Sequence, residues 1–272
     1  MTTIARYLRL YACFLRTGLM QEMTFRGNFL IRVGTELLWF VLLCLFYEVI
    51  YQKTNTIAGW SKFEYLVLIG THFVATGIVE TFFMPNLGEL SEKVRTGRLD
   101  FALAKPVDEQ FLLTMQNTDW ATATNVVYGA GMILYSLAQL QSSPTVLACI
   151  VYLITLLAGV AVFYSLMVML AVTAVWLIRN QHIYELWFYV NIFGRFPPDV
   201  FDGRLGSPLR KLLTFVIPVL IAVSVPAQTL CRNLLDLEPR LAVYSLVAAG
   251  CFLWLSRQVF RWALRHYRSA SS

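Results

Sequence analysis

The stretch Trp120–Ile178 decides the fold class, and it reads WATATNVVYGAGMILYSLAQLQSSPTVLACIVYLITLLAGVAVFYSLMVMLAVTAVWLI. It runs for 59 residues without a single Asp, Glu, Lys or Arg. One transmembrane helix needs only ~20 predominantly apolar residues to cross a hydrocarbon core of ~30 Å. The run therefore predicts two membrane spans, which are joined by a hairpin at the polar tetrapeptide Gln141–Pro144.

The rest of the chain has the same character. Of 272 residues, 58% are hydrophobic and only 14% are charged, whereas soluble domains carry roughly 25% charged residues. The pattern of apolar segments predicts an all-α polytopic membrane protein with about six transmembrane helices. The predicted spans are Phe29–Tyr51, Phe63–Met84, Asp119–Leu140, Thr145–Ile178, Leu212–Cys231 and Leu241–Trp262.

The N-terminal segment, residues 1–27, has a different pattern. Ile4, Tyr7 and Tyr11 share one helical face, while Arg6 and Arg9 lie toward another. Such a helix is typical of the membrane interface, and the arginines leave no clean apolar core for a cleaved signal peptide. We therefore expect an interfacial helix here, with an ordinary extension of the first span as the alternative.

The basic residues predict the orientation. Eighteen of the 22 Lys and Arg residues lie in the N-terminal region, the segments 88–106 and 179–211, and the C-terminal region. Only four lie in the alternate connections. Because cytoplasmic loops are enriched in Lys and Arg, we expect both termini and both long segments to be cytoplasmic. The net charge of +6 is then explained by topology and by contact with membrane lipids, and it indicates no nucleic-acid binding.

One of these segments, residues 88–106, concentrates charge between two apolar spans. Leu87, Leu90 and Val94 fall at helical spacing with charges between them, which predicts a short amphipathic helix. Gly97 is expected to end that helix, and Pro106 to stop any continuation. A membrane protein that concentrates charge in one short loop presents it to a soluble partner.

Two motifs, which occur in a fixed order along the chain, resemble those of a known protein family. Gly97-Arg98-Leu99-Asp100 is followed by Leu103 and Lys105-Pro106, and the later segments Phe193–Pro198, Leu209–Pro218 and Val225–Ala227 follow in order. Over roughly Arg26 to Leu264, this arrangement resembles the ABC-2 type exporter permeases, although Phe196-Pro197 stands where that family often has Tyr-Pro. The resemblance implies a single transmembrane domain over residues 1–272, located in the bacterial cytoplasmic membrane.

The resemblance also implies partners. Such permeases form the translocation pathway of an exporter in pairs, with a second copy or a related chain, and each permease binds a separate ATPase subunit. The loop after the second span is the coupling helix in that family. The residues expected at the ATPase interface are Leu90, Glu92, Lys93, Val94, Arg95, Gly97, Asp100, Lys105 and Pro106. Among them, Leu90 and Val94 are expected to fill a groove on the ATPase.

Catalytic motifs are absent from the sequence. The chain contains no G-x-x-x-x-G-K-[ST] phosphate-binding loop, no G-x-S-x-G and no H-E-x-x-H. The five cysteines form no C-x-x-C pair, so we expect neither a disulfide framework nor a metal site. The chain is therefore expected to be no enzyme, with ATP and magnesium bound by the partner. The alternatives are an integral-membrane lipid-modifying enzyme and a non-ABC transporter or scaffold.

A few ionisable or helix-breaking residues lie inside the predicted spans. His72 and Glu80 are two turns apart on one face, so they line a polar pathway or form a hydrogen bond between helices. Glu36 follows Arg32 by four residues, which predicts an ion pair. Pro218 and Pro226 interrupt the predicted fifth span and indicate either a packing kink or a bent helix beside the exit path.

Overall fold

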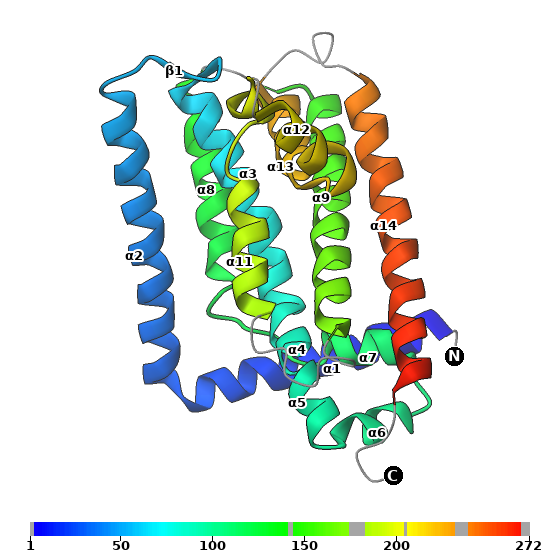
Figure 1. Ribbon diagram of the computed structural model, residues 1–272. Helices are drawn as coiled ribbons and strands as arrows, with labels where there is room; N and C mark the ends of the chain where they lie inside the picture. The colour runs from blue at the N-terminus through cyan, green and yellow to red at the C-terminus, as the bar shows by residue number, and fades with distance from the viewer. Residues whose placement is uncertain (1–2, 141–143, 174–182, 204–205, 232–238, 268–272) are drawn as a thin grey trace.

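The computed structural model describes residues 3–140, 144–173, 183–203, 206–231 and 239–267, which are mostly helical. Its upright helices are α2 (Arg26–Tyr51), α3 (Lys62–Phe82), α8 (Thr124–Gln139), α9 (Val146–Val172) and α14 (Pro239–His266), which stand side by side in Figure 1. Four helices in the described residues are long and apolar enough to cross a membrane, namely α2, α3, α9 and α14. The predicted all-α polytopic fold is therefore confirmed.

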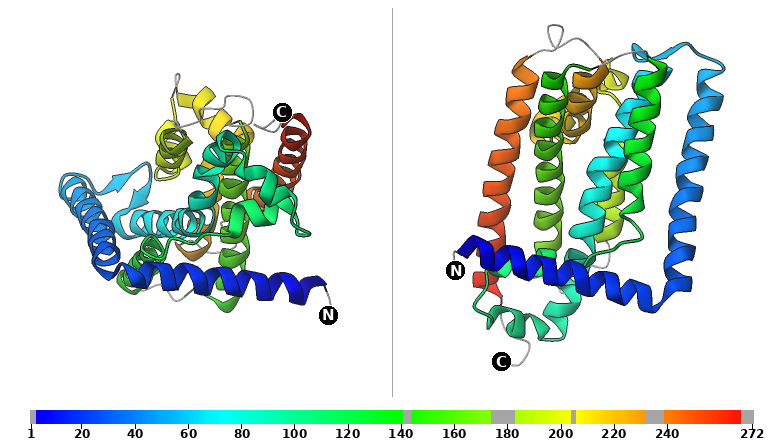
Figure 2. Two further views of the ribbon diagram at one scale, coloured as in Figure 1. Left: turned by 90° about the horizontal axis from the view of Figure 1, so that it is seen from below. Right: turned by 180° about the vertical axis from the view of Figure 1, so that it is seen from behind.

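The two ends of the bundle differ. At one end, here called the α1 end, α1 (Thr3–Thr24) lies across the upright helices, as Figure 2 shows. The same end holds four short helices: α4 (Met84–Gly88), α5 (Leu90–Arg95), α6 (Arg98–Leu103) and α7 (Glu109–Met115). At the opposite end, here called the hairpin end, β1 (Thr56–Ile57) pairs antiparallel with β2 (Trp60–Ser61).

Helix α3 forms the centre of the bundle. In the 18-residue apolar stretch of α3, 78% of the residues are buried, whereas none are buried in the corresponding stretch of α2. Its crossing with α8 depends on two glycines, because a Cβ added at Gly129 would lie 2.6 Å from the carbonyl oxygen of Gly70. Small residues let helix backbones approach closely, which is how helices associate inside a membrane.

Helix α11 (Ile183–Phe193) shows that the predicted second cytoplasmic loop is wrong. Trp187 of α11 contacts Glu80 near the end of α3, whereas the Arg195 carbonyl accepts a hydrogen bond from Tyr65 in its first turn. The chain therefore runs antiparallel to α3, from the α1 end toward the hairpin end. Of the predicted loop, residues 179–182 and 204–205 lie outside the described residues.

The predicted fifth span, Leu212–Cys231, is also wrong. After the short 3-10 helix η1 (Pro198–Phe201), the chain forms α12 (Gly206–Lys211), the π-helical turn η2 (Leu212–Val216) and α13 (Val219–Cys231). An 81° bend separates η2 from α13. Pro218 lies at this bend, and proline disfavours helical backbone in the residue before it. Because α14 begins at the hairpin end (Figure 1), the bent pair enters and leaves at that end as a re-entrant hairpin.

These corrections redistribute the basic residues. Twelve described basic residues lie at the α1 end: Arg6, Arg9, Arg16, Arg26, Arg32, Lys93, Arg95, Arg98, Lys105, Arg257, Arg261 and Arg265. Six lie in the hairpin half: Lys53, Lys62, Arg195, Arg210, Lys211 and Arg240. The excess at the α1 end is smaller than the sequence suggested, but its sign is unchanged.

Candidate functional site

Helices α5 and α6 form a compact turn at the α1 end. Gly97 separates them with a φ of 69°, in the left-handed region that side chains other than glycine rarely adopt. This confirms the prediction that Gly97 ends the first helix. Arg95 donates two hydrogen bonds to the Glu92 carboxylate, at 2.9 and 2.8 Å, so the charges on the outer face are held in a defined arrangement.

The apolar residues of this turn face inward. Leu90, Val94 and Leu99 are 2%, 7% and 0% exposed and belong to the core of the chain. The prediction that Leu90 and Val94 fill a groove on a partner is therefore wrong in this structure, because their own chain already covers them. Lys93 is also largely buried and forms an ion pair with Glu89 at 3.3 Å.

The outer face of the turn carries a different apolar residue. Phe101 is 76% exposed, and Arg95, Arg98 and Glu92 lie on the exposed side of the same two helices. We call these four residues the α5–α6 surface. Sequence reasoning missed Phe101, although its position two residues after the buried Leu99 places it on the opposite face of α6.

The remaining predicted residues lie behind or beside this surface. Asp100 is in the first turn of α6, and Lys105 is exposed. The carbonyl of Pro106 accepts a 2.6 Å hydrogen bond from Arg6 of α1. Pro106 therefore positions α1 against the loop.

Polar contacts at helix α7 connect the loop of residues 88–106 to the upright helices α9 and α14. Its N-cap residue, Asp108, accepts from the Phe111 amide at 3.0 Å and forms an ion pair with Arg257 of α14. Arg257 also donates to Gln110 at 3.0 Å, and Gln110 donates to the Tyr164 hydroxyl of α9 at 2.9 Å. Partial burial alone would raise the pKa of Asp108, but the Arg257 guanidinium and the Phe111 amide together hold it below its ordinary value.

A second polar region follows the contact between α3 and α11. Glu80 accepts hydrogen bonds from Trp187 at 2.9 Å and from Asn191 at 3.2 Å. The Nε2 atom of His72 lies 3.0 Å from the Asn191 carbonyl oxygen. The sequence-based alternative of a hydrogen bond between helices is therefore confirmed for both His72 and Glu80.

The predicted ion pair between Arg32 and Glu36 is wrong. Arg32 pairs with Asp119 and, at 3.3 Å, with Glu22. Glu36 instead accepts a 2.9 Å hydrogen bond from Asn125 of α8. Both side chains pair with residues outside α2. A spacing rule within one helix does not consider such partners.

A cavity of about 430 Å³ opens beside the α3–α11 contact. Its apolar wall includes Trp39, Leu42 and Phe46 of α2 and Phe188 of α11, and its polar wall contains Glu36, His72, Glu80, Asn125, Asn191 and Arg195. The Oδ1 atoms of Asn125 and Asn191 are buried and have no hydrogen-bond partner among the described residues. The cavity therefore has the chemistry to hold a molecule with one apolar and one polar part.

A family model described as "ABC-2 family transporter protein" matches residues 37–271. The chain belongs to the ABC-2 transporter family. The match covers α2 from residue 37 onward and all later elements, while α1 lies outside it. No curated protein matches the chain, and no solved structure matches it either.

Because it belongs to the ABC-2 transporter family, the chain is a membrane permease component of an ABC transporter. Within its described residues, no group of three or more His, Cys, Asp or Glu side chains is arranged to hold a metal ion. Pro218 and Pro226, expected beside the pathway, do not line the cavity that contains His72 and Glu80. Pro218 lies at the 81° bend that precedes α13, and Pro226 lies inside α13.

Proposed function

We propose that the chain is the permease subunit of an ATP-driven exporter, and that it works in a pair with a second permease. Separate ATPase subunits, which bind ATP and magnesium, would dock on the α5–α6 surface. The observation that carries this proposal is the exposed Phe101 between charged side chains at the α1 end. Family membership supports it, as does the absence of any nucleotide-binding motif in the sequence.

The α5–α6 surface has the composition of a docking site. Interfaces depend on a few large anchors, often aromatic, which are surrounded by polar residues that contribute less. Phe101 provides the anchor, while Arg95 and Arg98 provide the charged rim. The buried Leu90, Val94 and Leu99 hold this surface firmly against the permease.

Motion at this surface has a physical route to the spans. The loop continues into α7, and α7 is joined through Asp108 and Gln110 to Arg257 of α14 and Tyr164 of α9. A displacement of the loop by the ATPase would therefore move two spans together. Packed side chains and hydrogen-bond networks of this kind carry coupling between distant sites.

The orientation follows from the charges. The α1 end carries most of the described basic residues, so the positive-inside rule favours a cytoplasmic location for it. Both ends of the chain would then be cytoplasmic, in the inner membrane of a bacterium. In a background without the native cysteines, an impermeant maleimide applied to intact cells should label Asn55→Cys in the hairpin but not Thr96→Cys. The reverse labelling would overturn the orientation.

Cargo would pass beside the α3–α11 contact. The cavity there joins an apolar wall to a polar wall, which suits an amphiphilic molecule. The apolar face of α2 next to it is exposed, with Leu38, Trp39 and Phe46 each more than half accessible. The second permease would cover this face and close the pathway.

The decisive experiment compares two exposed phenylalanines at the same end. When it is co-expressed with its ATPase subunit, wild-type permease should co-purify with that subunit as a complex. Phe101→Ala should weaken ATPase association at least tenfold, because truncated interface anchors cost ~2 kcal/mol or more. Phe25→Ala is the matched control, since Phe25 is 71% exposed but lies outside the α5–α6 surface. Wild-type association and export by Phe101→Ala would refute the docking site.

The polar residues in the cavity also favour a second function, a lipid-modifying enzyme, because Glu36, His72 and Glu80 converge inside an apolar bundle. The two functions differ in what the purified chain does alone. A permease in proteoliposomes should neither hydrolyse ATP nor change the lipids around it. Lipid turnover without an ATPase, lost in Glu80→Gln, would favour the enzyme.

A further inference from the structure

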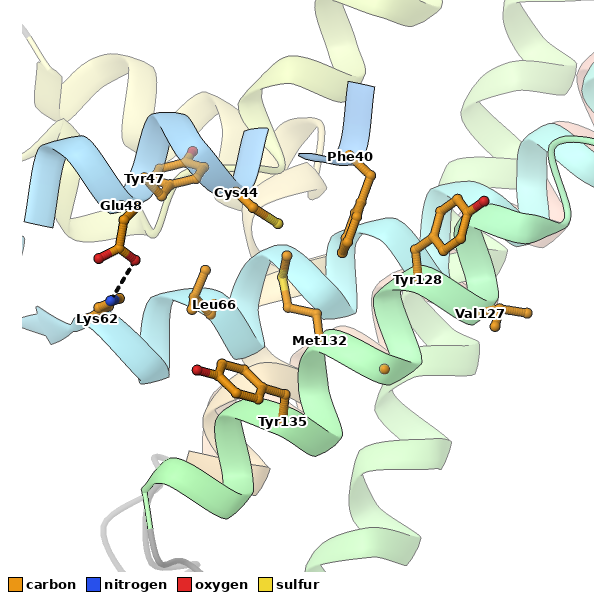
Figure 3. A pocket seen from close by; sticks show the side chains of 11 residues that line it. Phe40, Cys44, Tyr47, Glu48, Lys62, Leu66, Val127, Tyr128, Met132 and Tyr135 are labelled. Atoms are coloured by element: carbon orange, nitrogen blue, oxygen red, sulfur yellow. Dashed lines mark ion pairs between the residues drawn. The ribbon is translucent and has the colours of Figure 1, made fainter. Parts of the chain in front are cut away.

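A second cavity, of about 450 Å³, lies between α2, α3 and α8, away from α11. Figure 3 shows that Phe40 and Cys44 enter it from α2, Leu66 from α3, and Met132 from α8. Most of its wall is apolar. Its volume is within the range of ~300–1,000 Å³ that is typical of small-molecule sites.

The cavity has a charged mouth at the hairpin end. Lys62, the first residue of α3, pairs with Glu48 of α2 through a 2.6 Å contact between Nζ and Oε2 (Figure 3). Both side chains are partly exposed, at 33% and 48%. A partly exposed ion pair contributes little, so each charge remains able to bind a group from outside.

We infer that this cavity binds one zwitterionic phospholipid from the membrane leaflet at the hairpin end. One acyl chain would lie along Met132 and Phe40 inside the bundle. The lipid phosphate would meet the ammonium group of Lys62, and the lipid amine would meet the carboxylate of Glu48. An adjacent pair of opposite charges above an apolar slot is the complement of such a headgroup and its chain.

The dimensions favour a lipid chain over a protein helix. A helix ~10 Å across would fill roughly 800 Å³ in two turns, which exceeds the cavity. An empty apolar space would leave its lining without partner atoms, whereas the surrounding bilayer supplies acyl chains to fill it. The bound acyl chain would also pack against α2, whose 18-residue apolar stretch is not buried by the rest of the protein.

The test uses two glycines that have room for a side chain. A Cβ added at Gly131, which lines the cavity, or at Gly250, which lies on α14, would meet nothing within 4 Å. The full chain in detergent is titrated with dioleoylphosphatidylethanolamine, and bound lipid is counted by native mass spectrometry. Gly131→Leu should weaken binding at least tenfold by filling the slot, while Gly250→Leu should bind like the wild type.

Two further arms test the headgroup. Lys62→Gln should weaken binding of the zwitterionic lipid about threefold or more, and dioleoylphosphatidylglycerol, which lacks the amine, should bind less tightly to the wild type. Glycerophosphoethanolamine, which has no acyl chains, should not compete. Unchanged binding in Gly131→Leu, or equal binding of both lipids by the wild type, would overturn the inference. None of these outcomes depends on ATPase docking or export, so they leave the proposed transport function untouched.

Discussion

Helices α2 and α3 are consecutive in the chain, are both long enough to span a membrane, and occupy opposite kinds of environment. Of the residues in the 18-residue apolar stretch of α3, 78% are buried, whereas none are buried in that of α2. The more hydrophobic helix is the exposed one, with mean hydropathies of 2.0 for α2 and 1.4 for α3. Inside a bilayer, lipid tails satisfy large apolar side chains, so small and polar residues mark the packed helix.

The largest expected effect tests close packing at the centre. A Cβ at Gly70 of α3 would lie 2.7 Å from Ile133 Cγ1 and 2.8 Å from the Gly129 carbonyl oxygen. Gly70→Leu should therefore separate α3 from α8 and destabilise the protein by about 3 kcal/mol or more. The measurement is the melting temperature of detergent-solubilised protein by size-exclusion chromatography after heating.

Gly34→Leu is the control for this variant, because a Cβ at Gly34 of α2 would meet nothing within 4 Å. It should leave the melting temperature of the isolated chain nearly unchanged. Equal losses in both variants would show that α2 is as tightly packed as α3, and the contrast between the two helices would fail.

A smaller effect is expected from the carboxylates of the two helices. Glu80 of α3 accepts two hydrogen bonds in the core, whereas Glu36 of α2 accepts one, from Asn125. Glu80→Ala should cost about 2 kcal/mol because it leaves the Trp187 and Asn191 donors unpaired. Glu36→Ala should cost less, and Glu80→Gln should recover part of the loss. Chemical denaturation monitored by tryptophan fluorescence would rank the three variants.

The next test extends the comparison to α14, another peripheral helix. Polar contacts from Arg257 to Asp108 and Gln110 attach it to α7. Because the folded pKa of Asp108 lies below its ordinary value, this carboxylate stabilises the fold above its unfolded pKa. That stabilisation is lost as the pH falls through the lower, folded pKa.

Asp108→Asn should therefore reduce the acid-side decline of the melting temperature, and near neutral pH it should lower the melting temperature by about 1–3 °C. Melting curves of both proteins between neutral and strongly acidic pH provide the measurement. Parallel curves at all pH values would show that Asp108 contributes nothing to the acid dependence.

The smallest effect is expected on the exposed face of α2. Trp39 is 67% exposed, so Trp39→Ala should change the stability of the single chain by less than ~0.5 kcal/mol. Phe40 packs against Phe73 and Tyr128, with ring centroids 5.4 and 5.3 Å away, and Phe40→Ala should cost more. If Trp39→Ala instead weakens association between two permeases in crosslinking experiments, α2 forms part of their interface.

The candidate site was only partly predictable, and the charged loop of residues 88–106 shows why. Helical spacing correctly placed Leu90 and Val94 on one face, and Gly97 was correctly predicted to end the helix. Periodicity does not say whether an apolar face meets its own chain or a partner. Here α5 packs it against the body of the permease, which leaves Phe101 outside. The residues at the contact between α3 and α11 show the same limit, because Asn191 and Trp187 lie more than 100 positions after Glu80.

The sequence by itself determined the membrane class, the position of the charged loop and the family resemblance, because each rests on local composition or on short ordered motifs. Only the tertiary structure decided that the chain bends by 81° within Leu212–Cys231, and that α11 packs antiparallel to α3. Hydropathy records whether a segment suits the bilayer, and α12–α13 is apolar enough to pass that test. Whether the chain crosses depends on the bend at Pro218 and on the place left between α3, α9 and α14, which are properties of the assembled bundle.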